Sequence, residues 1–291
     1  MSNSNASVFL EKKDSGRLVT LNKPSSLNAL DLNMIDLLGN IYDNLLVDSS
    51  AGCVILQGAG EKAFCAGGDV VSIYHKGLAA KKDKDEKVPS EFFRREYIVD
   101  NKIANLNKPH VALIDGITMG GGVGVSVHGK FRVATEKSLF AMPETGIGLF
   151  PDVGGSHFLP HLNPKNIGFH LALTGAHVRG GGVLKHLGIA THAVQTADLD
   201  KLKSELLALP SLCSEHDVAQ VLHNFDTIEA SPLVTPEEEE LIANVYDVES
   251  FEECWQNLSE LRANGNEWAT RTMATLEKVS AISVRVAFEQ L

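Results

Sequence analysis

The sequence has 291 residues, of which 44% are hydrophobic and 22% charged, a composition typical of globular proteins and long enough for one large domain or a domain with an appendage. The formal net charge of −11 argues against a general nucleic-acid-binding surface, although a few local lysines or arginines could hold the phosphates of a small ligand. No apolar run reaches about 18 residues, so no membrane-spanning segment is expected.

The cysteines and the amino terminus bear on the compartment. The four cysteines are scattered without a CxxC pair, which favours reduced thiols in a reducing compartment. The first residues, MSNSNASVF, lack the basic and apolar regions of a signal peptide and the arginine of a transit peptide. Any targeting segment is therefore expected to be missing from this chain.

The amino-terminal part predicts alternating strands and helices. Residues 8–12 and 18–22 flank the turn residues Asp14-Ser15-Gly16 and predict a β-hairpin. Apolar residues at helical spacing follow Asp31, which is a suitable helix N-cap. A strand over 53–57 then runs into a glycine-rich loop, GAGEKAFCAGGD. The alternation of strands and helices indicates the α/β class.

Two segments follow that loop. Residues 78–87, LAAKKDKDEK, mix charges without an apolar face and predict a mobile surface loop. The alternative is a lid whose lysines meet a phosphorylated ligand. Helical spacing resumes over 90–105, where Glu96 lies near the apolar side.

A glycine cluster organises the middle of the chain. The apolar run 111–114 predicts a buried strand, and Gly120-Gly121-Gly122 comes shortly after it. Because residues 123–127 look helical, the cluster would lie at a helix N-terminus, where backbone N–H groups lack helical partners and can meet a ligand.

Two acids appear in the acid-poor stretch that follows. Glu144 comes directly after Pro143, and Asp152 directly after Pro151. Amide donors for a developing oxyanion, beside carboxylates that could attack or move a proton, are the groups that acyl chemistry requires.

The rest of the chain is predicted to be helical. Thr235, Pro236 and Glu238 form a capping-box signature, so the acidic run 237–240 is interpreted as a helix start and not as an interaction tail. The predicted helices cover 166–173, 183–187, 199–209, a segment from 235 onward, 251–263 and 267–290.

Three ordered motifs resemble the crotonase superfamily. They are FCAGGDV (64–70), DGITMGGGVGVSVHG (115–129) and FAMPETGIGLFPDVGG (140–155), and the similarity extends to LNKPSSLNAL (21–30) and to residues 173–194. The resemblance implies an α/β fold, a spiral of ββα turns over residues 1–205. A helical C-terminal region over 206–291 is expected to be shorter than in the family, whose members continue for several more helices.

The resemblance also implies the site. The backbone N–H groups of Gly68 and Gly121 would form the oxyanion hole, with Glu144 as the catalytic glutamate, Asp152 as the second acid and Glu96 as a further substrate contact. His128 and Cys65 are interpreted as structural residues. The CoA-binding positions carried over from the family are Leu27, Ala29, Lys62 and Ala66.

The carboxylates discriminate between reactions. A hydratase of this superfamily uses two glutamates, and the position of the first corresponds to Gly124, which has no side chain. The missing glutamate favours hydrolysis of the thioester, with Glu144 as nucleophile or general base. The resemblance implies the substrate, a short branched hydroxyacyl-CoA such as 3-hydroxyisobutyryl-CoA, and a role in valine breakdown. A hydratase or isomerase of the same superfamily, or a non-catalytic CoA-binding protein, are the alternatives.

The expected partner is the acyl-CoA substrate. No cofactor, metal, nucleic acid or membrane span is expected, and a homo-oligomer is compatible with the resemblance. The expected location is the mitochondrial matrix in a eukaryote or the cytoplasm in a bacterium.

Overall fold

The computed structural model describes residues 6–82 and 88–291. Within these residues, none of the helices combines the length and the apolar character needed to cross a bilayer.

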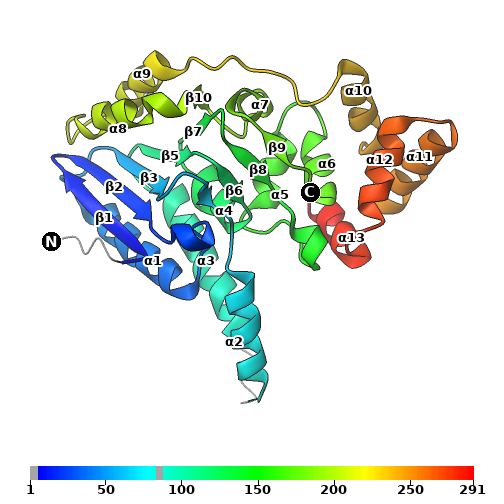
Figure 1. The fold of residues 1–291 in the computed structure, drawn as a ribbon, viewed down its shortest axis with the longest axis horizontal. Helices are drawn as coiled ribbons and strands as arrows, with labels where there is room; N and C mark the ends of the chain where they lie inside the picture. Colours follow the sequence, from blue (N-terminus) through cyan, green and yellow to red (C-terminus); the bar gives the residue numbers. More distant parts are fainter. Residues whose placement is uncertain (1–5, 83–87) are drawn as a thin grey trace.

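A six-stranded sheet forms the first layer of the core (Figure 1). Its order is β1-β2-β3-β5-β7-β10, with β1 and β2 antiparallel, as the predicted hairpin requires, and the remaining neighbours parallel. Parallel strands covered on both faces carry near-continuous apolar runs, as the fully buried β5 does. The strands are β1 (Val8–Lys13), β2 (Gly16–Leu21), β3 (Val54–Gly58), β5 (His110–Ile114), β7 (Phe131–Thr135) and β10 (His192–Val194).

Alternate residues of these strands feed two hydrophobic clusters on opposite faces of the sheet. Val54 and Leu56 belong to the larger cluster with α1 (Leu32–Val47) and α3 (Val88–Ala104). Ile55 belongs to the smaller cluster, with α8 (Leu199–Leu207) and α9 (Glu215–Phe225). The period-two alternation along a strand thus decides which helices cover each face.

A second, four-stranded sheet has the order β4-β6-β8-β9, in which β4, β6 and β8 are parallel. Three successive strand pairs, β3–β4, β5–β6 and β7–β8, each place the first strand in the large sheet and the second in the small one, before a helix follows. This is the expected spiral of ββα turns. The elements are β4 (Ala63–Cys65), β6 (Ile117–Met119), α4 (Gly121–Val127), β8 (Leu139–Ala141), β9 (Val178–Arg179) and α7 (Gly181–Leu187).

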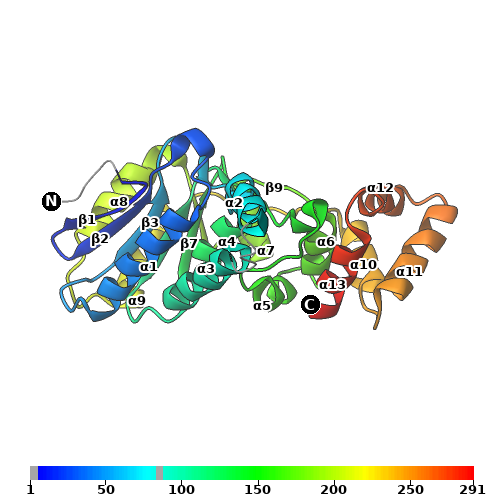
Figure 2. The same cartoon turned by 90° about the horizontal axis from the view of Figure 1, so that it is seen from below.

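The helices that follow α9 extend the molecule to one side of the spiral (Figures 1 and 2). Helix α6 (Ile167–Thr174) contacts three of the C-terminal helices and so joins this extension to the core. The C-terminal helices are α10 (Pro236–Val245), α11 (Phe251–Ala263), α12 (Glu267–Leu276) and α13 (Ala281–Gln290).

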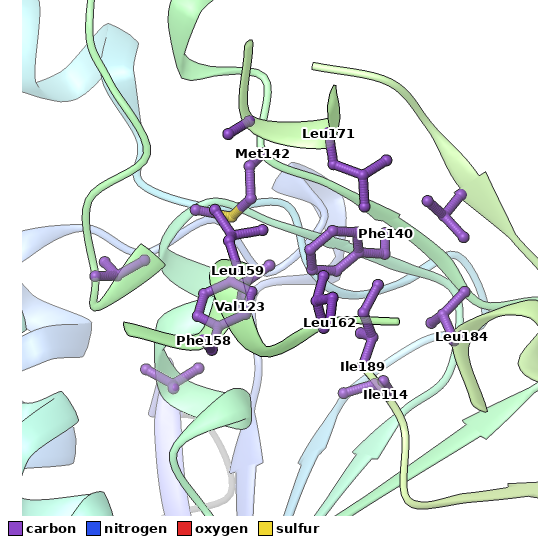
Figure 3. Packing of buried hydrophobic residues seen from close by; sticks show 14 of the residues in the cluster. Ile114, Val123, Phe140, Met142, Phe158, Leu159, Leu162, Leu171, Leu184 and Ile189 are labelled. Atoms are coloured by element: carbon purple, nitrogen blue, oxygen red, sulfur yellow. The ribbon is translucent and has the colours of Figure 1, made fainter. Parts of the chain in front are cut away.

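Buried side chains of the large cluster hold α4 and the strand before Glu144 in place. Val123 of α4 lies with Met142, Phe158 and Leu159 in this cluster (Figure 3). The rings of Phe140 and Phe158 meet edge to face, with centroids 6.5 Å apart. Packing therefore fixes the elements that carry the predicted site residues.

The structure corrects two predictions and adds one helix that was not predicted. Residues 78–82 are not a loop: they belong to α2 (Val70–Lys82), while residues 83–87 lie outside the described residues. The single helix predicted over 267–290 is two helices, because Ser280 caps a new helix by accepting from the N–H of Ser283. Helix α9 was not predicted, although Ser214 and Asp217 form a capping box at its start, which is a signal for a helix N-terminus.

The predicted division between residues 205 and 206 falls inside α8, which packs with α9 on the large sheet. That the chain forms two separate domains stays a prediction.

Asn28 provides a test of what holds the loop between β2 and α1. Its fully buried amide donates to the carbonyls of Ala59 and Ala63, each at 2.9 Å, and accepts from the N–H of Lys23. Asn28→Ala removes these bonds and leaves buried partners unpaired, so we expect a loss of about 1–3 kcal/mol in the free energy of unfolding, measured with urea.

The matched control is Asn33→Ala, which removes only an exposed bond to Ser7. We expect this variant to stay within about 0.5 kcal/mol of the wild type. Equal losses in the two variants would show that the Asn28 contacts do not stabilise the fold.

Candidate active site

The site forms where three parallel strands of the small sheet end. Strands β4, β6 and β8 are neighbours and run in the same direction, so their carboxyl ends share one edge. Gly67-Gly68 follows the first strand, Gly120-Gly121 the second and Pro143-Glu144 the third. Segments that are far apart in the sequence are thereby brought together.

Gly68 and Gly121 offer their backbone N–H groups at this edge. Gly121 is the first residue of α4, where a backbone N–H has no helical acceptor. Within the described part of the chain, neither of these two nitrogens donates a backbone hydrogen bond. A Cβ on Gly67 would lie 3.6 Å from the nitrogen of Gly121, which shows how closely the two loops approach.

The Gly68 loop is held from its other side. The N–H of Leu30 donates to Gly67, and the N–H of Asp69 donates back to Leu30, each at 2.8 Å. The ammonium of Lys23 bridges Asp31 and Asp69 at 3.1 and 3.2 Å. The backbone of the loop is therefore fixed without use of its Gly68 N–H group.

Carboxyl groups occupy the space left by the missing side chains of the glycine cluster. A Cβ on Gly120 would lie 3.0 Å from Oε1 of Glu144, and a Cβ on Gly121 would collide with Oε1 of Glu96. The structure therefore brings Glu144 and Glu96, two of the three predicted acids, to the glycine cluster. It also shows that any side chain at Gly121 would displace Glu96.

Asp152 lies in the loop after β8 and joins the same group. Its Oδ2 accepts a 2.8 Å hydrogen bond from the hydroxyl of Tyr97, a residue of α3. Helix α13 braces both acid-bearing loops, since the N–H of Ser280 donates to Thr145 and the Nε2 of Gln290 donates to Pro151.

Burial sets the protonation of these acids. It raises the pKa of Glu144 to about 8, with a further contribution from the charge of Asp152. Burial also raises the pKa of Asp152 and, more strongly, that of Glu96, which additionally faces neighbouring carboxylates. One oxygen of Glu144 and one of Glu96 are buried without a hydrogen-bond partner among the described residues.

Sequence reasoning missed two residues on α3. Tyr97 contacts Asp152, and Asp100 lies one helical turn beyond Glu96, 5% exposed. The four-residue spacing from Glu96 is the only signal that could have pointed to Asp100, because such residues share one helix face.

His128 and Cys65 have the structural roles that were expected. The Nε2 of His128 is 2.7 Å from the carbonyl oxygen of Val153, to which it donates, and so ties α4 to the Asp152 loop. Cys65 is fully buried, and burial raises the pKa of its thiol to about 12, which disfavours the reactive thiolate.

The predicted CoA-binding positions lie on two segments that pair with each other. The N–H of Ala66 donates to the carbonyl of Leu27 at 3.0 Å, and Ala29 lies in the turn that Asn28 anchors. Lys62 is exposed at the start of the other segment.

A cavity of about 510 Å³ adjoins Asp152 and Asp100. It lies between α3 and the Asp152 loop, and its walls include Tyr97, Asp100, His128, Asp152 and Val153. Among the described residues, no group of three or more His, Cys, Asp or Glu side chains is arranged to hold a metal ion.

A glycine-bearing helix N-terminus at the edge of the small sheet, with buried acids around it, is the arrangement of a crotonase-type site. Residues 16–291 match the enoyl-CoA hydratase/isomerase family, and the chain belongs to this family.

The names of its curated relatives specify one reaction within this family. The chain is 46% identical to the mitochondrial 3-hydroxyisobutyryl-CoA hydrolase of Danio rerio, over 100% of this chain and 74% of the relative. It is 45% identical to the protein of the same name from Homo sapiens, over 98% of this chain and 72% of the relative.

Solved structures support the fold. A carnitinyl-CoA dehydratase from Mycobacterium thermoresistibile superimposes with a TM-score of 0.84 at 33% identity, and an enoyl-CoA hydratase from Rhodobacter sphaeroides with 0.80 at 30%. Both comparisons cover 98% of this chain and 78% of the other.

The raised pKa of Glu144 predicts a gain of stability on its removal. Between pH 4.5 and about 8 the folded protein holds a proton that the unfolded chain releases, so stability falls as pH rises through this window. Glu144→Gln removes the penalty, and we expect it to raise the free energy of unfolding by roughly 3 kcal/mol near pH 8 and by little near pH 4.5.

Glu136→Gln is the control, because Glu136 is exposed and its pKa is lowered, in part by the N–H of Thr196. Denaturant unfolding at the two pH values measures the effect. A Glu144→Gln variant that gains no stability at pH 8 would show that the carboxyl is not buried at a cost.

Proposed function

We propose that this chain hydrolyses 3-hydroxyisobutyryl-CoA to 3-hydroxyisobutyrate and CoA. The observation that carries the proposal is the buried Glu144 carboxyl beside the glycine loop at the N-terminus of α4. The choice of substrate rests on the names of the curated relatives.

The thioester carbonyl would lie between the N–H groups of Gly68 and Gly121. Two donors fixed in place before substrate arrives would stabilise the negative charge that develops on the oxygen. The positive end of α4 adds to this effect, although the helix is short.

Glu144 would act on the carbonyl carbon, either by direct attack or by taking a proton from the attacking water. A pKa of about 8 makes it a stronger base than an ordinary glutamate while leaving a useful ionised fraction near neutral pH. In both routes the C–S bond breaks, CoA leaves as a thiol after protonation, and water supplies the new oxygen of the acid.

Asp152 and Glu96 would orient the acyl group or the water. The bond from Tyr97 favours the charged form of Asp152, which gives it one fixed acceptor oxygen and one oxygen for a ligand. Glu96 lies against Gly121 and so close to the proposed carbonyl position.

Hydration of a double bond is the runner-up reaction, because the solved neighbours are named hydratases and dehydratases. Gly124 argues against it. A glutamate there would have to displace Val153, whose Cβ would lie 2.7 Å from the added Cβ. Relatives at about 45% identity carry the name of a hydrolase, which also favours hydrolysis.

The CoA part would lie along residues 22–30 and 62–68, with Leu27, Ala29 and Ala66 against it and Lys62 near a phosphate. No cofactor beyond the substrate's own CoA is proposed. The curated relatives are named mitochondrial, so we propose the mitochondrial matrix in a eukaryotic source and a role in valine breakdown.

Release of free CoA from 3-hydroxyisobutyryl-CoA tests the proposal. We expect Glu144→Gln to lower kcat by about 10²–10⁴ with little change in KM, since the amide fills the same space but neither attacks nor accepts a proton. Asp152→Asn should lower kcat less, because an orienting residue is partly replaced by an amide.

A Glu144→Gln enzyme with wild-type turnover would contradict the proposal. Wild-type protein that hydrates an enoyl-CoA and releases no CoA would establish the hydratase reading. Tight binding of CoA esters without either reaction would establish a non-catalytic protein.

A further inference from the structure

Among the residues that the structure describes, Asp100 has no partner that explains its burial. It is 5% exposed, and within the described residues neither carboxyl oxygen has a hydrogen-bond partner. A carboxyl group buried without partners is costly, and buried polar groups in proteins are almost always paired. Packing alone therefore does not account for an acid at this position.

Asp100 lies between α4 and the cavity beside Asp152. A Cβ on Gly124 would lie 2.9 Å from the Oδ2 of Asp100. Asp100 also lines the cavity that Asp152 and Tyr97 line. Gly124 is three residues beyond Gly121 on α4, which is about 4.5 Å along a helix axis. That spacing is comparable to the span from a thioester carbonyl to a hydroxyl on the third carbon of the acyl chain.

We propose that Asp100 keeps its proton and, together with Asp152, forms a binding site for the hydroxyl group of the acyl chain. The hydroxyl donates to the ionised carboxylate of Asp152, and the protonated carboxyl of Asp100 donates to the hydroxyl oxygen. This inference rests on the proposed function and extends it by naming what selects the substrate.

The hydrogen-bond inventory requires at least one of the two acids to hold a proton. A hydroxyl has one hydrogen to donate and lone pairs that accept. Two ionised carboxylates could only accept, and they would repel each other across the site. The bond from Tyr97 favours charge on Asp152, whereas burial and the charge of Asp152 raise the pKa of Asp100.

The carboxamide of asparagine can replace a protonated carboxyl as a hydrogen-bond donor, and leucine cannot. The experiment compares kcat/KM for 3-hydroxyisobutyryl-CoA with that for isobutyryl-CoA, which lacks the hydroxyl. We expect the wild type to prefer the hydroxylated thioester and Asp100→Asn to keep this preference. Asp100→Leu should lower the preference by about tenfold, because the hydroxyl loses one donor, while it still hydrolyses isobutyryl-CoA.

Asn101→Leu is the matched control. Asn101 is the next residue of α3, is exposed at the mouth of the same cavity and has no part in the proposed hydroxyl site. Its substitution should leave the preference unchanged. An Asp100→Leu enzyme with the wild-type preference would overturn the proposal, as would an Asp100→Asn enzyme that loses it equally.

If Asp100→Leu fails to fold, the proposal is tested by how the preference for the hydroxylated thioester depends on pH. The wild-type preference should decline as pH rises through the raised pKa of Asp100, because the ionised group no longer donates. In Asp100→Asn this decline should vanish, and an identical decline in both enzymes would overturn the proposal. The other titratable groups around Asp100 remain in both enzymes and cancel in the comparison: Glu96, Tyr97, His128, Glu144, Asp152 and His157.

Failure of the underlying function gives a different result. Wild-type protein that hydrolyses neither thioester would refute the proposed reaction itself, before any variant is compared.

Discussion

The site depends on the close approach of other elements to the glycines of one short helix, α4. At Gly121 and Gly124 of α4, carboxyl oxygens of α3 lie where a Cβ would be or directly against it. Gly122 lets the backbone of β4 approach in the same way, since a Cβ there would collide with the carbonyl oxygen of Cys65. A methyl group at Gly121 or Gly124 would displace these carboxyl groups, and one at Gly122 would push β4 away.

This arrangement has an energetic cost. Glu96, Asp100 and Glu144 are all at most 5% exposed, and burial raises the pKa of each. The fold offsets the cost through its two hydrophobic clusters, of which the larger one holds α4 through Val123. Perturbed carboxyls at the end of a rigid scaffold are the pattern expected of a site for proton transfer.

The site residues were predicted from the family resemblance, and the parallel strands explain why they meet. Because β4, β6 and β8 are parallel neighbours, the segments that follow them share one edge, where Gly67 approaches Gly121 and Gly120 approaches Glu144. Local signals also fixed α1, where Asp31 accepts from the N–H of Met34 as a capping residue should.

Features that depend on tertiary packing escaped prediction. Asp100 on α3 has its significance only through Gly124 and Asp152, which lie on other elements and have no local relation to it. The lysine-rich residues 78–82 have no apolar face, yet they continue α2 in the structure. Intrinsic helix propensity, which is favourable for alanine and lysine, accounts for this better than amphipathicity does.

The account depends on acids around α4, above all Glu144 and Asp100, holding protons at neutral pH in the free protein. Infrared difference spectra at pH 7 between the wild type and each of Glu144→Gln and Asp100→Asn test it directly, because protonated and ionised carboxyls absorb at different frequencies. We expect each substitution to remove absorption of a protonated carboxyl. Loss of carboxylate absorption alone in both variants would contradict the account.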